Sequence, residues 1–199
     1  IKVFFQNQDD FKMFVDERLV QKEKCDVLPG SGVDITKFIP VEKEDDGIFR
    51  FLLVSRMLWA KGIQEFVEAA KIIKVKYGNI EFQLLGHLDM ASPTAISKKQ
   101  MDTWVTDGYI KYLGSSDDVR VEIAQADCVV LPSFYREGTP RILLESASME
   151  KPIITTDNIG CRDVVDDRIN GYLCEVKNSK DLADKIESEK KKIEDMAGI

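Results

Sequence analysis

The chain has 199 residues, of which 44% are hydrophobic and 32% are charged, enough for one globular domain with a sizeable core. Acidic residues outnumber basic ones by 35 to 28, and the formal charge of -7 argues against broad nonspecific binding to nucleic acid or anionic lipid. No apolar run approaches the ~20 residues of a membrane-spanning helix, and no signal peptide opens the chain.

The first part of the chain stands apart from the rest. The segments "KVFFQN", "DDFKMFVDERL" and "CDVLPG" predict a strand–helix–strand unit, and "GSGVDITKF" with "PVEKEDDGIF" reads as a linker. The opening "IKVFFQNQDD" lacks an initiator Met and looks like the middle of a protein. We therefore expect residues 1–46 to be a remnant of a preceding domain with its linker, and residues 47–199 to be a main domain truncated at both ends.

Six short apolar runs follow, and several of them lack alternation, which indicates burial on both faces of a parallel sheet. They are Phe49–Ser55, Ile80–Gly86, Ile110–Gly114, Asp127–Ser133, Pro152–Asp157 and Gly171–Val176. Helical patterns such as "IQEFVEAAKIIKVKYG" and a charged tail helix, "SKDLADKIESEKKKIEDMAGI", alternate with them. The chain therefore predicts an α/β fold, a Rossmann-like doubly wound parallel sheet.

Two helix starts carry capping residues. In "DDVRVEIAQA", Asp117 or Asp118 is the expected N-cap, and in "TPRILLESASM" we expect Thr139 as N-cap with Pro140 at the first helical position.

The four cysteines are widely separated and contain no CxxC pair, so we expect free thiols, largely buried, in a reducing cytoplasm. They are Cys25, Cys128, Cys161 and Cys174.

Ligands of open α/β sheets bind beyond the carboxyl ends of the strands, so residues directly after the predicted strands are candidates for a site. Arg56 and Lys61 lie between the first strand of the main domain and its helix. Two cations beside a helix start favour an anion, and a diphosphate suits this arrangement. The alternative is that Lys61 is solvated and that Arg56 pairs with a nearby carboxylate.

Two glutamates surround a second helix start, in "REGTPRILLE". Gly138 allows the backbone to approach a ligand, so a phosphate could dock at this helix start, with Glu137 and Glu145 accepting hydroxyl groups on either side. The alternative roles are an i,i+4 pair of Glu145 with Arg141 and a solvated loop position for Glu137.

These motifs together resemble the donor-binding, C-terminal domain of retaining GT-B glycosyltransferases of family 4, the "glycosyl transferases group 1" domain. The resemblance runs from "VLPGSGVDITKF" through "LLVSRMLWAKGIQEFVEAA", "LLGHLD", "YLGSSDDV" and "EGTPRILLESAS" to "GCRDVVDDRINGYLCEV". It includes the paired glutamates of the family, Glu137 and Glu145.

The resemblance also implies roles for single residues. Arg56 and Lys61 would bind the donor diphosphate, and Glu145 would bind the ribose. The transferred sugar would be held by Glu137 and by the backbone of Gly138, Thr139 and Pro140. Ser116 would lie near the base. Arg56, Lys61 and Glu137 would then act directly in the transfer. Many relatives carry Phe-Gly where this chain has Thr139-Pro140, and proline has no N–H to donate.

The activity implied by the resemblance is transfer of a hexosyl group from a nucleotide diphosphate sugar, a UDP-sugar being favoured, with retained configuration. The acceptor would be a saccharide or lipid-linked sugar in bacterial surface polysaccharide synthesis, bound by a missing N-terminal domain. No Asp-x-Asp pattern occurs, so no metal is expected, and the leaving phosphate would help to deprotonate the acceptor. We expect a cytoplasmic protein that works at the inner face of the membrane, and an isolated chain with little or no activity.

Two other functions are consistent with the residues: a non-catalytic nucleotide-binding module and a GT-B nucleotide-sugar epimerase. Dinucleotide and P-loop sites are disfavoured because no GxGxxG follows a strand and no GxxxxGK[ST] occurs. We expect His87 to be a surface residue at the rim, Trp59 to pack under the cationic turn and Arg162 to be structural.

Overall fold

The computed structural model describes residues 1–28, 30–89 and 91–197. Pro29, in the predicted "CDVLPG" segment, and the last two residues of the predicted tail helix lie outside the described residues.

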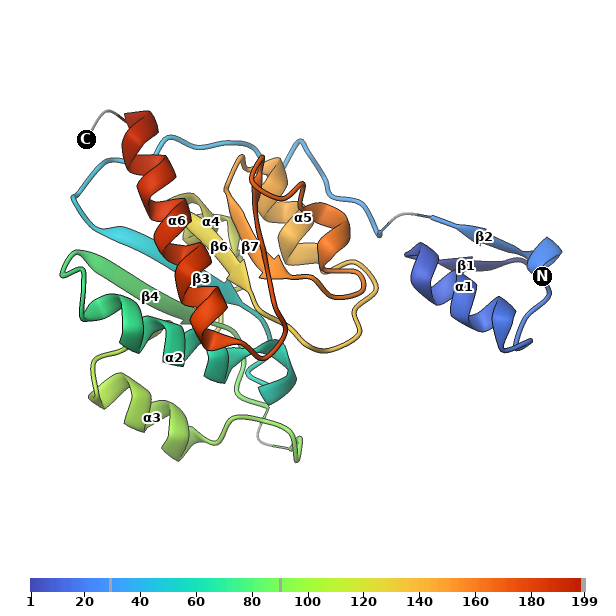
Figure 1. The fold of residues 1–199 in the computed structure, drawn as a ribbon, viewed down its shortest axis with the longest axis horizontal. Helices are drawn as coiled ribbons and strands as arrows, with labels where there is room; N and C mark the ends of the chain where they lie inside the picture. Colours follow the sequence, from blue (N-terminus) through green and yellow to red (C-terminus); the bar gives the residue numbers. More distant parts are fainter. Residues whose placement is uncertain (29, 90, 198–199) are drawn as a thin grey trace.

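Residues 1–28 form the strand–helix–strand unit predicted from the sequence, here called the N-terminal unit (Figure 1). It consists of β1 (Val3–Phe5), α1 (Gln8–Asp16), the short 3-10 helix η1 (Lys22–Lys24) and β2 (Cys25–Val27), and the two strands pair in parallel. Asn7 caps α1, since its Oδ1 accepts a hydrogen bond from Asp10 N at 2.7 Å.

The main body contains a six-stranded parallel sheet with the order β5-β4-β3-β6-β7-β8, which confirms the predicted doubly wound sheet. Its strands are β3 (Phe49–Val54), β4 (Ile80–Leu85), β5 (Lys111–Tyr112), β6 (Cys128–Leu131), β7 (Ile153–Thr156) and β8 (Gly171–Cys174). The sheet starts at β3 and grows first to one side and then, from β6, to the other. The topological switch point therefore lies between β3 and β6.

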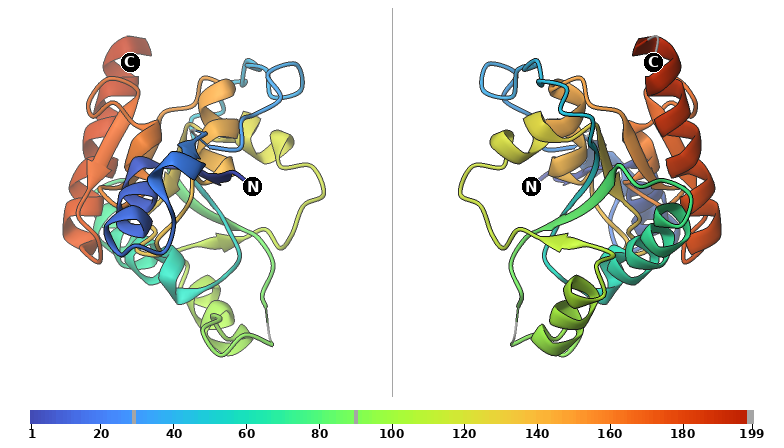
Figure 2. Two further views of the ribbon diagram at one scale, coloured as in Figure 1. Left: turned by 90° about the vertical axis from the view of Figure 1, so that its right-hand side faces the viewer. Right: turned by 90° about the vertical axis from the view of Figure 1, so that its left-hand side faces the viewer.

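Helices cover both faces of the sheet (Figure 2). α2 (Ile63–Lys74), α3 (Lys98–Thr106) and α6 (Ser179–Ala197) pack on one face, and α4 (Arg120–Gln125) and α5 (Arg141–Ser148) on the other. Because side chains alternate along a strand, Phe51 and Leu53 of β3 point to the α2 face and Leu52 to the α4 face. All three are fully buried, as expected for a sheet covered on both faces.

Both predicted helix starts need correction. Pro140 has φ -62° and ψ 120°, an extended conformation, so it is the N-cap, and α5 begins at Arg141. Val119 occupies the N-cap position of α4, although Asp118 Oδ1 still accepts from Arg120 N at 3.2 Å. α3, which Ser97 caps through a bond from Gln100 N, had no prediction of its own.

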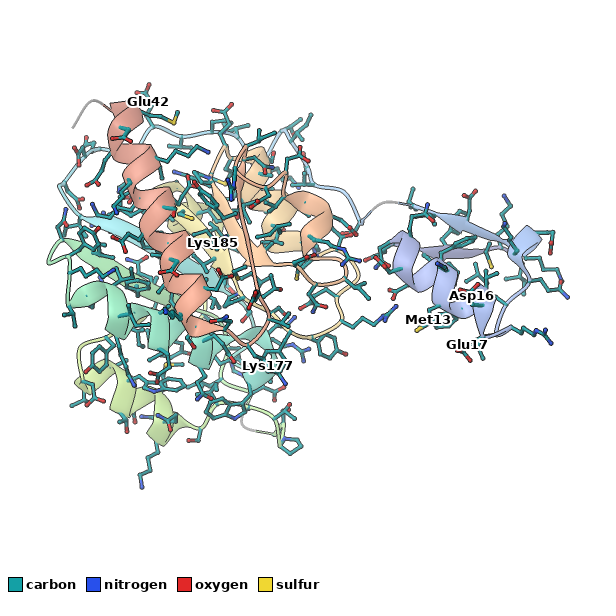
Figure 3. All side chains as sticks on the ribbon, viewed as in Figure 1. Met13, Asp16, Glu17, Glu42, Lys177 and Lys185 are labelled. Atoms are coloured by element: carbon teal, nitrogen blue, oxygen red, sulfur yellow. The ribbon has the colours of Figure 1, made fainter. Side chains whose placement is uncertain are left out.

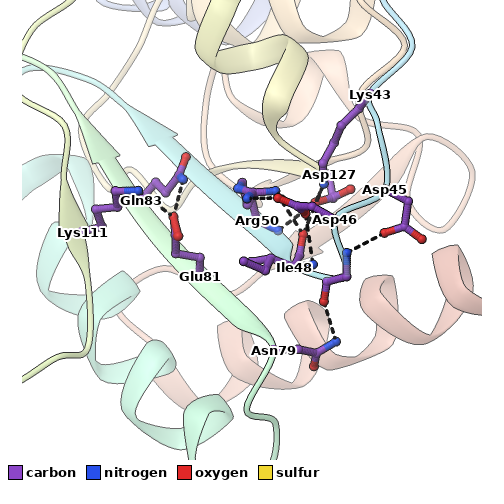
Figure 4. A network of polar contacts seen from close by, with 11 residues as sticks. Lys43, Asp45, Asp46, Ile48, Arg50, Asn79, Glu81, Gln83, Lys111 and Asp127 are labelled. Carbon is purple, nitrogen blue, oxygen red and sulfur yellow. Dashed lines mark hydrogen bonds and ion pairs between the residues drawn. The ribbon is translucent and has the colours of Figure 1, made fainter.

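The linker is fastened to the amino ends of the strands (Figure 4). Lys43 Nζ lies 2.5 Å from Asp127 Oδ2, which also accepts from Arg50 N at 2.8 Å. The Arg50 guanidinium pairs with Asp46, and this hydrogen bond holds the pKa of Asp46 well below its ordinary value. The linker is thus anchored at the edge opposite to the carboxyl ends.

The long helix α6 runs along the α2 face, and Lys177 lies two residues before its first residue (Figure 3). Lys177 Nζ lies 4.5 Å from the centre of the Phe134 ring. Glu189, further along α6, is only 1% exposed, and burial raises its pKa. Among the described residues, no helix combines the length and apolar character needed to cross a membrane.

The cysteines are free thiols, as predicted. Cys128, Cys161 and Cys174 are buried, and burial raises the pKa of each, to about 11 for Cys161 and about 12 for Cys174.

Candidate functional site

The carboxyl ends of β3 and β6 lie side by side at the switch point, and the loops that leave them carry the candidate residues. The 3-10 helix η2 (Trp59–Lys61) follows β3 and ends at Lys61, and the loop from Pro132 to Pro140 follows β6 and contains Glu137.

Lys61 and Glu137 meet in a direct ion pair between Nζ and Oε1, although they are 76 positions apart in the chain. Their side chains are 16% and 12% exposed, and Ser133 Oγ donates a second bond to Glu137 Oε1 at 2.9 Å. Lys61 Nζ also lies 5.4 Å from the centre of the Tyr135 ring. The structure therefore contradicts the alternatives of a solvated Lys61 and a solvated Glu137.

Backbone contacts hold the two loops together. The Ala60 carbonyl accepts bonds from Phe134 N at 3.0 Å and Tyr135 N at 3.1 Å. Gly62, directly after Lys61, has φ +75°, and a Cβ there would lie 2.0 Å from the Pro132 carbonyl oxygen. Only glycine permits this approach, so the turn that presents Lys61 depends on it.

The N-terminal unit contacts the other side of the same loop. Asn7 Nδ2 lies 3.4 Å from the Glu137 carbonyl oxygen and 3.3 Å from that of Gly138, and Gln6 Oε1 accepts from Thr139 N at 3.1 Å. Sequence reasoning missed both side chains because it assigned the first residues to a remnant. The rule that singles out residues directly after strands, applied to "KVFFQN", would have marked them.

Arg56 and Ser116 lie in the loops after β3 and β5, and Glu145 lies within α5, which follows β6. Arg56 is exposed, and no ion pair within the described residues involves it. The Ser116 Oγ accepts from Asp118 N at 3.2 Å. Glu145 is 8% exposed and pairs with Arg141 at 3.2 Å, so the alternative i,i+4 pair is present. None of the three is in direct contact with the Lys61–Glu137 pair among the described interactions.

The structure also places His87, Trp59 and Arg162, the other residues considered in the sequence analysis. His87 is exposed, and its carbonyl accepts from Met57 N at 3.0 Å. Trp59 packs edge-to-face against Trp104, with ring centres 5.9 Å apart. Arg162 pairs with Asp9 at 2.9 Å and with Asp157 at 3.4 Å, and so connects the N-terminal unit with the turn after β7.

In chemical terms, the loop after β3 carries two cationic side chains, and the loop and helix after β6 carry a helix N-terminus and two shielded carboxylates. The cations and amides can bind an anion, and the carboxylates can accept hydroxyl groups. Residues 1–28, 30–89 and 91–197 contain no group of three or more His, Cys, Asp or Glu side chains that could hold a metal ion.

Comparison with known proteins gives a family match over most of the chain. The family model described as "Glycosyl transferases group 1" matches residues 48–188. N,N'-diacetylbacillosaminyl-diphospho-undecaprenol alpha-1,3-N-acetylgalactosaminyltransferase of Campylobacter jejuni is 31% identical over 194 residues, which cover 92% of this chain and 49% of that protein. UDP-Gal:alpha-D-GlcNAc-diphosphoundecaprenol alpha-1,3-galactosyltransferase of Escherichia coli is 27% identical, with 85% of this chain and 46% of that protein covered.

Solved structures share the fold. A glycosyltransferase from Rickettsia africae superposes with a TM-score of 0.82 at 20% identity, covering 96% of this chain and 53% of that one. HepE of Anabaena, in complex with UDP and glucose, gives 0.78 at 20% identity, covering 94% and 52%. The chain thus spans about half the length of the relatives named here.

Proposed function

This chain belongs to the glycosyl transferases group 1 family, and from that premise we propose that it is the donor-binding domain of a retaining, family 4 glycosyltransferase. The reaction moves a hexosyl group from a nucleotide diphosphate sugar, with UDP favoured, to a saccharide or lipid-linked acceptor in bacterial surface polysaccharide synthesis. The names of the Campylobacter and Escherichia relatives support this acceptor class, and the UDP bound to HepE supports this donor class.

The observation that carries the proposal is the shielded Lys61–Glu137 pair at the switch point. A diphosphate that enters beside Lys61 competes with the Glu137 carboxylate for the ammonium group. Lys61 then exchanges one anion for another, and the released Glu137 accepts hydroxyl groups of the transferred sugar. The resting pair keeps both groups in place until the donor arrives.

The other candidates surround this pair. Arg56 and the amides at the start of α5 stabilise the negative charge that grows on the leaving diphosphate, in the role a metal ion has elsewhere. Glu145 holds the ribose and Ser116 lies near the base. Of the amides that follow Glu137, that of Thr139 is engaged by Gln6 and Pro140 has none, which leaves the Gly138 amide for the sugar.

The proposal assigns residues 1–46 to the domain that binds the acceptor and to its linker. The leaving phosphate takes part in deprotonation of the acceptor hydroxyl, so the chain needs no side-chain base. Alone, this chain binds the donor but transfers little or no sugar, because the residues that bind the acceptor belong to the rest of the enzyme. The whole enzyme works in the cytoplasm, at the inner face of the membrane.

A thermal-shift panel with UDP-, GDP- and ADP-sugars tests the proposal. A ligand at 100 times its Kd stabilises the folded state by about 2.7 kcal/mol. For a chain of this size, that raises Tm by roughly 5–10 °C. We expect this shift with a UDP-sugar and its loss in Arg56→Ala and Glu145→Ala. Lys98→Ala, which removes another exposed cation, from α3, is the matched control and should keep the shift. No shift with any nucleotide sugar would refute the proposal.

A further inference from the structure

The N-terminal unit contacts the loop of Glu137 through residues directly after β1. Asn7 is 3% exposed, and its Oδ1 caps α1. Its Nδ2 donates to Asp10 Oδ2 at 3.1 Å and faces the carbonyl oxygens of Glu137 and Gly138. Gln6 accepts the hydrogen bond of the Thr139 amide. These contacts join parts of the chain more than 130 positions apart.

Asn7 and Gln6 bind the two polar ends of one peptide group. The Gly138 carbonyl and the Thr139 N–H belong to the same planar trans peptide group and point in opposite directions. Asn7 binds the carbonyl at 3.3 Å and Gln6 binds the N–H at 3.1 Å, so rotation of this group would break both bonds. The orientation of the backbone directly after Glu137 is therefore fixed from outside the main body.

A side chain at Gly138 would displace the Gln6 amide, and one at Gly160 would meet the backbone of Gly138. A Cβ on Gly138 would lie 2.1 Å from Gln6 Oε1, and a Cβ on Gly160, which has φ +78°, would lie 1.8 Å from the Gly138 carbonyl oxygen. The peptide group is thus enclosed between the N-terminal unit and the turn after β7.

Two ion pairs flank this contact. Asp10 pairs with Arg136 at 2.6 Å, and Asp9 pairs with Arg162 at 2.9 Å. The side chains of both arginines are about 40% exposed, so each pair contributes little energy and mainly orients the two surfaces. The contacts of the buried Asn7 amide with the Glu137 and Gly138 carbonyls therefore determine how the Glu137 loop is oriented.

We propose that Asn7 and Gln6 are positioning residues for the sugar end of the donor site, an inference that rests on the proposed function. Asn7 and Gln6 fix the Gly138–Thr139 peptide group, and Asn7 also contacts the Glu137 carbonyl at 3.4 Å. That carbonyl shares a peptide group with the Gly138 N–H, so the two side chains hold the Gly138 amide and the Glu137 side chain toward the transferred sugar. They touch neither the diphosphate nor the base. Their contribution therefore concerns the sugar moiety of the donor and leaves the binding of the nucleotide portion unchanged.

Three variants separate this role from folding. Asn7→Ser keeps an N-cap oxygen for α1 but removes the Nδ2 donor, and with it the bond to Asp10 Oδ2 as well as the contacts with the Glu137 loop. Gln6→Met keeps the length of the side chain but loses the acceptor, whereas Gln6→Glu retains an oxygen for the Thr139 amide. Asn79→Ser is the matched control, because its Nδ2 donates to the Gly47 carbonyl at 3.2 Å at the opposite edge of the sheet (Figure 4).

The measurement is calorimetric titration of each variant of the 199-residue chain with UDP and with UDP-glucose, UDP-galactose and UDP-N-acetylgalactosamine. The readout is the ratio of the Kd for UDP to the Kd for the best UDP-sugar. Loss of one such bond should lower this ratio about threefold to tenfold in Asn7→Ser and Gln6→Met. Gln6→Glu and Asn79→Ser should keep the wild-type ratio.

The outcomes are distinguishable. Wild-type binding of UDP-sugars with unchanged ratios in Asn7→Ser and Gln6→Met overturns the positioning role alone. A parallel loss of UDP and UDP-sugar affinity also overturns it, because that result indicates a general structural effect. A wild-type chain that binds no nucleotide sugar overturns the proposed function, and the positioning role falls with it.

Discussion

The Lys61–Glu137 pair offers a quantitative test of the site through stability alone. Lys61→Met and Glu137→Gln each remove one charge while keeping most of the side-chain volume. The double variant removes both charges. We expect each single variant to be clearly less stable than the wild type, and the double variant to be more stable than the sum of the single changes predicts.

The magnitude follows from the burial of the pair. Two unit charges about 4 Å apart interact by about 4 kcal/mol at an effective dielectric constant near 20. The cost of removing both groups from water offsets much of this attraction. With side chains 16% and 12% exposed, we expect a net coupling energy of about 1–3 kcal/mol, as for residues that share one polar network. A loss of 2 kcal/mol lowers Tm by roughly 4–8 °C in a chain of this size.

Urea denaturation of the wild type, the two single variants and the double variant gives the coupling energy as a double-mutant cycle. The matched control is the Lys98–Asp102 pair of α3, whose side chains are 69% and 59% exposed. Its coupling should be only about 0.3–0.5 kcal/mol, as for other exposed i,i+4 pairs. A Lys61–Glu137 coupling no larger than that of the control would refute the account of a shielded, pre-formed pair.

Three further predictions concern other parts of the chain. Gly62→Ala should reduce the free energy of unfolding by about 3 kcal/mol, because the added Cβ meets the Pro132 carbonyl. Gly108 also has a positive φ, +76°, but faces open space, so Gly108→Ala should reduce the free energy of unfolding by only about 1 kcal/mol in the same urea assay. Burial raises the pKa of Glu189 above 4.5, so the carboxyl destabilises the fold as the pH rises through its folded pKa. Glu189→Gln should therefore raise Tm at pH 7 and leave it unchanged near pH 4; a lower Tm at pH 7 would contradict this reasoning. Cys25 should react with a thiol reagent in the native state while the three buried thiols react only on unfolding, and mass mapping that finds a buried thiol modified first would argue against the packing.

The sequence predicted the layers of the fold because apolar runs without alternation identify strands covered on both faces. It placed the start of α5 wrongly because proline is compatible with both the first helical position and an extended N-cap, and ψ decides between them. The sequence did not predict α3, because this helix buries only Met101 and Trp104, too few apolar residues for a clear helical pattern.

The site was predicted less completely than the fold. The residues after the strand ends could be marked one strand at a time, but the sequence does not reveal which strands are neighbours. The contact between Lys61 and Glu137 follows from the placement of β6 beside β3, which local patterns do not encode. The same limit applies to Asn7, whose partners lie about 130 positions away.

In the proposed function, the edge of the sheet at β3 and β6 binds a nucleoside diphosphate through cationic side chains and helix amides. Calorimetric titration of the chain with UDP, UMP and uridine, in the presence of EDTA and at two salt concentrations, measures this binding. We expect UDP to bind at least about tenfold more tightly than uridine, to need no metal and to bind more weakly at high salt. Equal affinities for UDP and uridine, or binding of UDP that disappears in EDTA, would contradict the account.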